Sequence, residues 1–152
     1  MTSWDAFQQV REIRDELLAA DFALTLSIRQ VEVNSNLLAA ANDVIGLRQL
    51  RRCASNLEST YLLRLFSTFE GVLRDYWSAA RPSPRLRRTP METLMNRIVI
   101  RRQIPNQISD AAHKVRVYRN WLVHPQAAAS RMTFEECKSR LGHFLSYLPP
   151  RW

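Results

Sequence analysis

The sequence predicts an all-α protein, folded as one bundle of five or six helices. The chain has only three glycines and its β-branched runs are short, which disfavours a sheet. Its apolar residues recur at spacings of three and four, the period of a helix buried on one face. Its 152 residues suffice to bury a hydrophobic core and show no second domain, so residues 1–152 are taken as a single domain.

The first predicted helix runs from about residue 3 to about residue 33, with Ser3 as its candidate N-cap. The Asn-Ser-Asn sequence at 34–36 is the predicted break. A second helical stretch is expected over 37–52, with a bend or break near Gly46.

A long helix is expected next, capped by Ser55 or Asn56 and ending near Ala80. Its apolar face comprises Leu62, Phe66, Phe69 and Leu73. The proline-rich stretch 81–85 then predicts a loop.

Three shorter helices complete the prediction. Thr89 and Pro90 are typical of an N-cap followed by a first-turn proline, and Pro105 closes that helix. A helix from Asn106 or Ser109 follows and ends at Pro125. The sequence 133–136, Thr-Phe-Glu-Glu, is a capping box that predicts a last helix over about 134–147, and prolines 149 and 150 terminate it.

The net charge is +8, and only Lys114 and Lys138 among the basic residues are lysine. Guanidinium groups match phosphate oxygens, so the charge favours a nucleic-acid ligand. Biased codon usage is the alternative explanation for so many arginines. Many of them precede the helix that begins near residue 106, namely Arg81, Arg85, Arg87, Arg88, Arg97, Arg101 and Arg102. This placement predicts a groove that follows phosphates, with Arg101 and Arg102 as substrate-binding residues.

Neither the cysteines nor the histidines predict a metal site or a cofactor. Cys53 and Cys137 are expected as buried or partly buried thiols, and no Cys/His spacing resembles a zinc site. No apolar stretch approaches the roughly 20 residues needed to span a bilayer, and the first residues do not resemble a secretory signal. We therefore expect a cytoplasmic protein without membrane contact. Trp77, Trp121 and Trp152 are expected in packing rather than stacked on bases.

The helix ending at Pro125 carries polar groups on one face. At about 100° per residue, Arg116, Arg119, Asn120 and His124 fall away from the apolar side, which includes Val115, Tyr118 and Leu122. They are expected to face solvent or another subunit. Pro125 ends the helix, so the His124 imidazole is free to approach Arg119. An ordinary solvated face is the alternative to a functional site.

Arg119-Asn120-x-x-x-His124, preceded by Val115-Arg116-x-Tyr118, resembles the Arg-polar-x-x-x-His motif of the HEPN superfamily of α-helical ribonucleases. Residues 61–77 are similar to that family's long helix with an acidic residue in mid-span, here Glu70. Residues 98–105 are similar to the basic segment that precedes the motif helix in the RiboL-PSP-like branch. The resemblance covers about residues 55–148 and implies a HEPN-like bundle.

The resemblance implies a metal-independent endoribonuclease in which Arg119, Asn120 and His124 are catalytic. The motif helices of two subunits would meet, so that both Arg119–His124 pairs line one cleft and the products carry a 2′,3′-cyclic phosphate. Arg116 is expected to contact substrate, and Glu70 to orient Arg119 or Arg116. One motif histidine per chain fits acid-plus-base catalysis poorly, which also favours a homodimer.

The family analogy further suggests a toxin-like or phage-defence effector in a bacterium, with an antitoxin or another neighbouring-gene protein as a partner. Two alternatives remain open at this point. One is a non-catalytic HEPN module that binds RNA or a protein through the same surface. The other is a plain helical oligomerisation domain.

Overall fold

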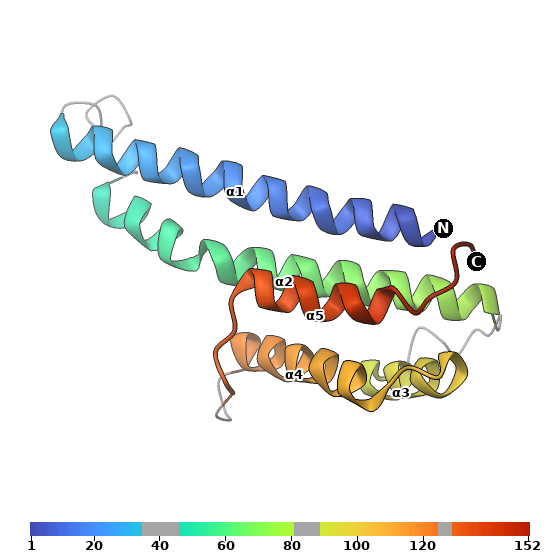
Figure 1. The fold of residues 1–152 in the computed structure, drawn as a ribbon. Coiled ribbons are helices and arrows are strands. Elements are labelled where there is room, and N and C mark those ends of the chain that lie inside the picture. Colours follow the sequence, from blue (N-terminus) through green and yellow to red (C-terminus); the bar gives the residue numbers. More distant parts are fainter. Residues whose placement is uncertain (35–45, 81–88, 125–128) are drawn as a thin grey trace.

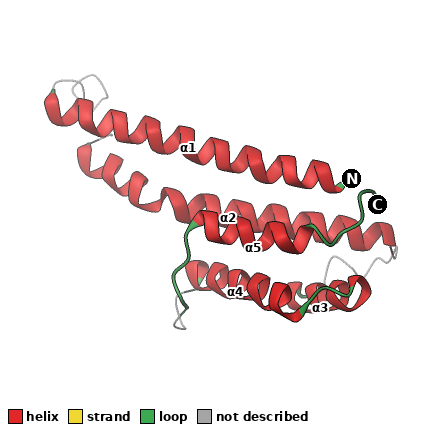
Figure 2. Cartoon of the chain, in the orientation of Figure 1, coloured by secondary structure: helices red, strands yellow, loops and turns green. Residues whose placement is uncertain are grey.

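A computed structural model describes residues 1–34, 46–80, 89–124 and 129–152, and its secondary structure is helical (Figure 2). The helices are α1 (Ser3–Val33), α2 (Leu47–Ala80), α3 (Met91–Arg102), α4 (Asn106–Val123) and α5 (Phe134–Leu145). Over these residues, β structure is limited to one bridge between Thr2 and Arg151. The predicted all-α fold class is confirmed.

The long helices α1 and α2 run side by side, and the three shorter helices pack near one end of this pair (Figure 1). At that end the two termini lie together, because the Ser3 amide donates to the Pro150 carbonyl at 3.1 Å and the Trp152 amide donates to Met1 at 3.3 Å. At the other end, α1 and α2 project beyond α3, α4 and α5 (Figure 1). The molecule is therefore a helical body with a two-helix extension.

The hydrophobic core lies in the body and is centred on α2. The predicted apolar face of this helix is confirmed, since Leu62, Phe66, Phe69 and Leu73 are all buried. Phe69 meets Phe144 of α5 edge to face, with ring centroids 5.5 Å apart. Trp77 is buried in the same core, and Trp152 packs edge-on against Tyr76. Trp121 stacks on Tyr118 at 5.8 Å, so all three tryptophans contribute to packing as predicted.

Side-chain caps begin two of the helices. The predicted box at the start of α5 is confirmed, because Thr133 Oγ1 accepts from the Glu136 amide and Glu136 Oε2 accepts from the Thr133 amide. For α1 the prediction of Ser3 was wrong by one residue. Thr2 is the N-cap, and it exchanges the same reciprocal bonds with Asp5.

The predicted helix start at Ser55 or Asn56 is wrong, since α2 is continuous from Leu47. The Ser55 hydroxyl donates to the Arg52 carbonyl at 2.9 Å, and the Asn56 carbonyl accepts from the Thr60 hydroxyl at 3.0 Å. Polar groups that bond to their own helix in this way do not interrupt it. The expected helical residues 37–45 lie outside the described part of the chain.

Prolines stand at the boundaries of α3 and α4. Pro90 rather than Thr89 occupies the N-cap position of α3, which then begins at Met91. Gln103, with a left-handed φ of 52°, ends α3, and Pro105 occupies the N-cap position of α4. The predicted start of α4 at Asn106 is confirmed. Residues 81–88 and Pro125 lie outside the described residues.

The two thiols differ in their surroundings. Cys137 is buried, and this burial raises its pKa to about 12. Cys53 is exposed on α2, so the prediction of a buried or partly buried thiol was wrong for this residue. Among the helices described, none combines the length and apolar character needed to cross a membrane.

Candidate functional site

Helix α4 carries the Arg-Asn-x-x-x-His motif and packs against α2, α3 and α5. Val115 and Tyr118 are buried as predicted, but Ala112 and Ser109 are buried as well. The buried face is therefore rotated towards the side of α4 that bears Arg116 and Arg119. Both arginines are half-buried, while Asn120 and His124 are exposed. The prediction of a fully solvent-facing set was wrong for the two arginines.

The Arg119 side chain lies back over α2. Its guanidinium carbon is 5.7 Å from the centroid of the Phe66 ring, a cation–π contact. Its Nη1 donates to Asn120 Oδ1 at 3.2 Å. Its Nε is buried. Among the described residues, neither Nε nor Nη2 has a hydrogen-bond partner. The aromatic ring thus positions a guanidinium with unused donors beside Asn120.

His124 is the C-cap residue of α4, and its backbone has left the helical conformation (φ −135°, ψ 85°). Its amide still donates to the Asn120 carbonyl at 2.8 Å, which fixes the backbone below the ring. Within the described residues, the imidazole has no hydrogen bond, to Arg119 or to any other group. The approach of the imidazole to Arg119 therefore stays a prediction.

Arg116 turns towards α3. Its Nη2 lies 3.0 Å from Glu92 Oε2, its side chain is only 19% exposed, and its Nε is buried without a partner. Burial lowers the pKa of His113, and the positive charge of Arg116 lowers it further. His113 Nε2 lies 2.9 Å from Asn96 Oδ1. Arg116 thus ties α4 to α3, and a substrate would have to compete with Glu92 for it.

The expected orienting role of Glu70 is wrong. Its Oε1 accepts from Nε and Nη2 of Arg74, one turn further along α2, at 3.0 and 2.6 Å. Arg74 also donates to the carbonyl of Thr89 at 3.2 Å. Glu70 therefore helps to hold the start of α3 against α2, and the motif arginines bond elsewhere.

The two predicted substrate-binding arginines of α3 differ. Arg102 is half-buried, and its Nε donates to the Tyr147 carbonyl at 2.7 Å, a bond that fastens the C-terminal segment to α3. Arg101 is exposed and lines a shallow hollow of about 430 Å³ with Trp77 and Arg97. Only Arg101 of this pair is placed to meet a ligand without disturbing the fold. Arg81, Arg85, Arg87 and Arg88 lie outside the described residues.

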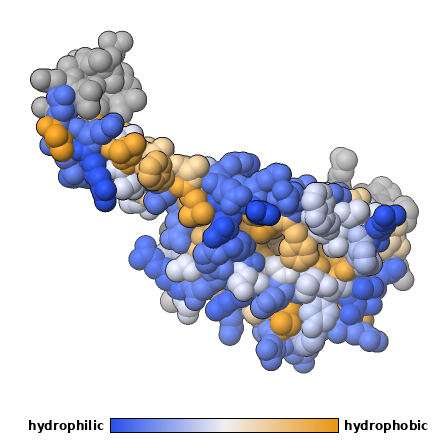
Figure 3. Space-filling view, turned by 45° about the horizontal axis from the view of Figure 1, so that its top comes forward, coloured by the Kyte–Doolittle hydropathy of each residue, from blue (hydrophilic) through white to orange (hydrophobic). Residues whose placement is uncertain are grey.

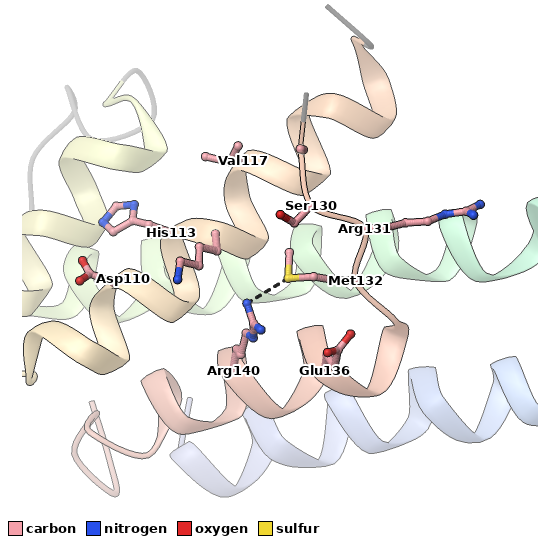
Figure 4. A pocket seen from close by; sticks show the side chains of 10 residues that line it. Asp110, His113, Val117, Ser130, Arg131, Met132, Glu136 and Arg140 are labelled. Atoms are coloured by element: carbon pink, nitrogen blue, oxygen red, sulfur yellow. Dashed lines mark hydrogen bonds between the residues drawn. The ribbon is translucent and has the colours of Figure 1, made fainter. Parts of the chain in front are cut away.

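A groove runs between α4, α5 and the segment that connects them (Figure 4). We call it the α4–α5 groove; it has a volume of about 630 Å³, and its lining includes His113, Lys114, Val117, Arg131, Met132 and Arg140. Arg140 rises from α5 towards Met132, and its Nη1 lies 3.1 Å from the thioether sulfur. A thioether is a weak acceptor and carries no charge. The thioether therefore does not neutralise the guanidinium, and Lys114 lines the same groove.

The acidic side chains of the groove reduce this positive field only in part. Asp110 lines it near His113, and Glu136 lines it beside Arg131. Glu136 is engaged by the Thr133 amide and hydroxyl, which lower its pKa. Arg131 extends away from Arg140 and also lines a second hollow of about 380 Å³ that reaches Tyr118 and Glu58 (Figure 4).

Sequence reasoning did not single out Lys114, Arg131 or Arg140 as ligand contacts. Arg131 and Arg140 reach the groove from the connecting segment and from α5, and no local spacing links them to α4. The groove is aligned with the motif, since at about 100° per residue His113, Val117, Asn120 and His124 share one face of α4. In the described residues, no group of three or more His, Cys, Asp or Glu side chains is close enough to hold a metal ion.

No protein-family model matches this chain, and neither a curated protein nor a solved structure is significantly similar to it.

Proposed function

We propose that this chain is a metal-independent endoribonuclease with Arg119, Asn120 and His124 as its reacting groups. The supporting observation is the contact of Asn120 with Arg119, one turn before His124. The side-chain oxygen of Asn120 accepts from the Arg119 guanidinium, and its backbone carbonyl accepts from the His124 amide. Arg119, Asn120 and the exposed His124 thus lie within about one turn at the C-terminal end of α4.

These groups suit the cleavage of RNA by transesterification, in which the 2′-oxygen displaces the 5′-oxygen at phosphorus. An imidazole takes the proton of a 2′-hydroxyl, whose oxygen attacks the adjacent phosphorus. The bond from phosphorus to the 5′-oxygen breaks, and that oxygen takes a proton from a second acid. The products are a 2′,3′-cyclic phosphate and a 5′-hydroxyl. The free donors of Arg119 stabilise the charge that develops on the phosphate oxygens.

The second acid comes from a second copy in this proposal. A homodimer that pairs two α4 helices brings two His124 side chains to one cleft, isologous about a twofold axis. The exposed face of α4 includes Val117 and Val123, 47% and 43% exposed, which would add apolar contact to such an interface. The α4–α5 groove of each subunit then leads RNA phosphates towards this cleft.

The biological role proposed here rests on the resemblance to HEPN ribonucleases alone. It is a toxin-like or defence effector in a bacterial cytoplasm, restrained by an antitoxin or another neighbouring-gene protein.

A non-catalytic module that binds RNA or a protein through this same surface is the second candidate function. The position of Arg119 favours it, because the guanidinium lies over Phe66 and makes no hydrogen bond with His124 in the described structure. Such a module would use the Lys114 and Arg140 charges without cutting.

Incubation of the purified protein with total RNA in EDTA separates the two functions. We expect cleavage to persist and the fragments to end in a 2′,3′-cyclic phosphate, detected by end-group analysis. RNA that is bound but left intact would support the non-catalytic module. Cleavage abolished by EDTA would contradict the proposed chemistry.

A further inference from the structure

Helix α1 leaves a row of large apolar side chains exposed where it extends beyond the body. Leu18 is 52% exposed, Phe22 71%, Leu26 45% and Val33 90%. Figure 3, turned towards α1, shows this hydrophobic surface along the extension. Single exposed apolar residues are common on protein surfaces, but a continuous row of them indicates an interaction surface.

The extension also lacks a core of its own. We call residues 17–33 of α1 and 47–61 of α2 the arm. Of its residues, only Val31 is buried, and burial on α2 begins at Leu62. The seam between its two helices is lined by half-buried side chains such as Leu24 and Leu57. Two helices alone therefore leave most apolar side chains of the arm at least partly exposed.

The exposed row is symmetric in its chemistry about Phe22. At about 100° per residue, one face of α1, an arc of about 80°, carries Asp15, Leu18, Phe22, Leu26 and Arg29. Leu18 and Leu26 lie four residues before and after Phe22. Asp15 and Arg29 lie seven residues before and after it, and both are exposed. The apolar centre is therefore flanked by Asp15, which pairs with Arg11 on the same face, on one side and by Arg29 on the other.

We propose that α1 pairs with α1 of a second copy, antiparallel and isologous, with the twofold axis at Phe22. In this arrangement Phe22 meets its own symmetry mate, Leu18 meets Leu26, and Asp15 faces Arg29 twice. An antiparallel copy places Asp15 opposite Arg29, whereas a parallel copy would place each of these charges opposite itself.

This interface is distinct from the α4 pairing in the proposed function. The axis at Phe22 lies five residues into the arm, and antiparallel pairing places the two bodies on opposite sides of this axis, so their motif helices stay apart. A chain with two different isologous interfaces forms assemblies larger than a dimer. The two interfaces can therefore be tested separately.

Mass measurement by analytical ultracentrifugation at about 10 µM tests the proposal. We expect Phe22→Glu to lower the mass of the assembly at least twofold, because two carboxylates would have to be buried next to each other at the axis. Ile100→Glu is the matched control, since Ile100 is 79% exposed on α3, and it should leave the mass unchanged. Both variants should keep the helical content of the parent, measured by circular dichroism.

A charge swap tests the orientation of the two copies. Asp15→Arg or Arg29→Asp alone should raise the dissociation constant of the arm interface by about tenfold, because two facing pairs become repulsive. The double variant should restore it. Asp15 is also 3.7 Å from Arg14, so the double variant controls for the loss of that local contact. An unchanged mass in Phe22→Glu, or a double variant no better than the singles, would overturn the antiparallel pairing. A monomeric parent at 100 µM, roughly ten times that concentration, would do the same and point to a different partner protein.

Discussion

Helices α1 and α4 both pack one face against α2 and leave the other face exposed, yet the two exposed faces differ in chemistry. Along the arm, α1 exposes Leu18, Phe22 and Leu26 without covering them. By contrast, α4 exposes Asn120 and His124 and borders the α4–α5 groove with its two adjacent cations. Packing one apolar surface against another lowers the free energy, because water is excluded from both. Polar groups with unused hydrogen-bond donors are stabilised instead by a charged ligand.

The difference assigns the two faces different tasks. Association is expected to depend mainly on α1, and RNA chemistry on α4. The predicted homodimer through α4 relies on Val117 and Val123 amid polar neighbours, and it offers less apolar contact than the arm. The following measurements test how far this separation holds.

The largest effect is expected at His124. His124→Ala should lower cleavage by about 10²–10⁴-fold through the loss of a proton-transfer group. Arg119→Ala should lower it by about 10²–10³-fold through the loss of a charge-stabilising donor. The double variant should resemble the worse single variant, because both groups act on one transition state. Rates are measured on one RNA substrate at fixed pH.

The control for this prediction is His143→Ala, which removes an exposed histidine on α5 that lines a different groove, next to α1. It should leave the rate unchanged. Arg119→Ala also removes the contact with Phe66, worth about 0.5–1 kcal/mol, so its thermal stability is measured as well. Full activity in His124→Ala would show that α4 does not carry the chemistry.

A second measurement compares the arm with the body by hydrogen exchange. The arm has few buried contacts, so its amides should exchange by local opening when the protein is dilute. Raising the concentration from well below the dissociation constant to about 100 times above it should slow this exchange by about 100-fold. Amides of 65–73, in the core part of α2, should not respond. Exchange in the arm that is independent of concentration would contradict its role in association.

A smaller effect is expected from the groove cations. Lys114→Gln and Arg140→Gln should each reduce the slope of log affinity against log salt by about 0.7 if each group contacts one phosphate of single-stranded RNA. Arg52→Gln, which removes an exposed charge from the arm, is the control. Binding is followed by fluorescence anisotropy with a 2′-deoxy oligonucleotide, which cannot be cleaved through a 2′-hydroxyl. Equal slopes in all variants would exclude the groove from the RNA path.

The smallest effect concerns His113. Burial and Arg116 lower its pKa below the usual value of 6.5, while Glu92 and Asp110 oppose the shift. The folded state therefore binds fewer protons than the unfolded state just below pH 6.5, and the free energy of unfolding falls as pH drops through this window. In His113→Gln the fall between pH 7.5 and 5.5 should be smaller, as measured by urea denaturation. An identical fall in both proteins would show that His113 does not contribute.

Local patterns were enough to predict the helices and much of their buried faces. The capping box at Thr133, the start of α4 at Asn106 and the burial of Val115 and Tyr118 all depend on residues within about one turn of one another. The Arg119-Asn120-x-x-x-His124 motif is local in the same sense, and the hydrogen bond between Arg119 and Asn120 joins neighbours in the chain. Such signals are present in the sequence because the backbone geometry of a helix sets the contacts.

The tertiary structure alone decided which side chains meet across the bundle. In the folded protein Arg116 pairs with Glu92 rather than with Glu70, and Arg102 donates to the Tyr147 carbonyl. The tertiary structure also placed Arg140 and Lys114 in one groove and left the row on α1 uncovered. Several partners suit each of these side chains equally well in charge or polarity. The packing of α2 against its neighbours chooses among them, and no residue spacing along the chain encodes that choice.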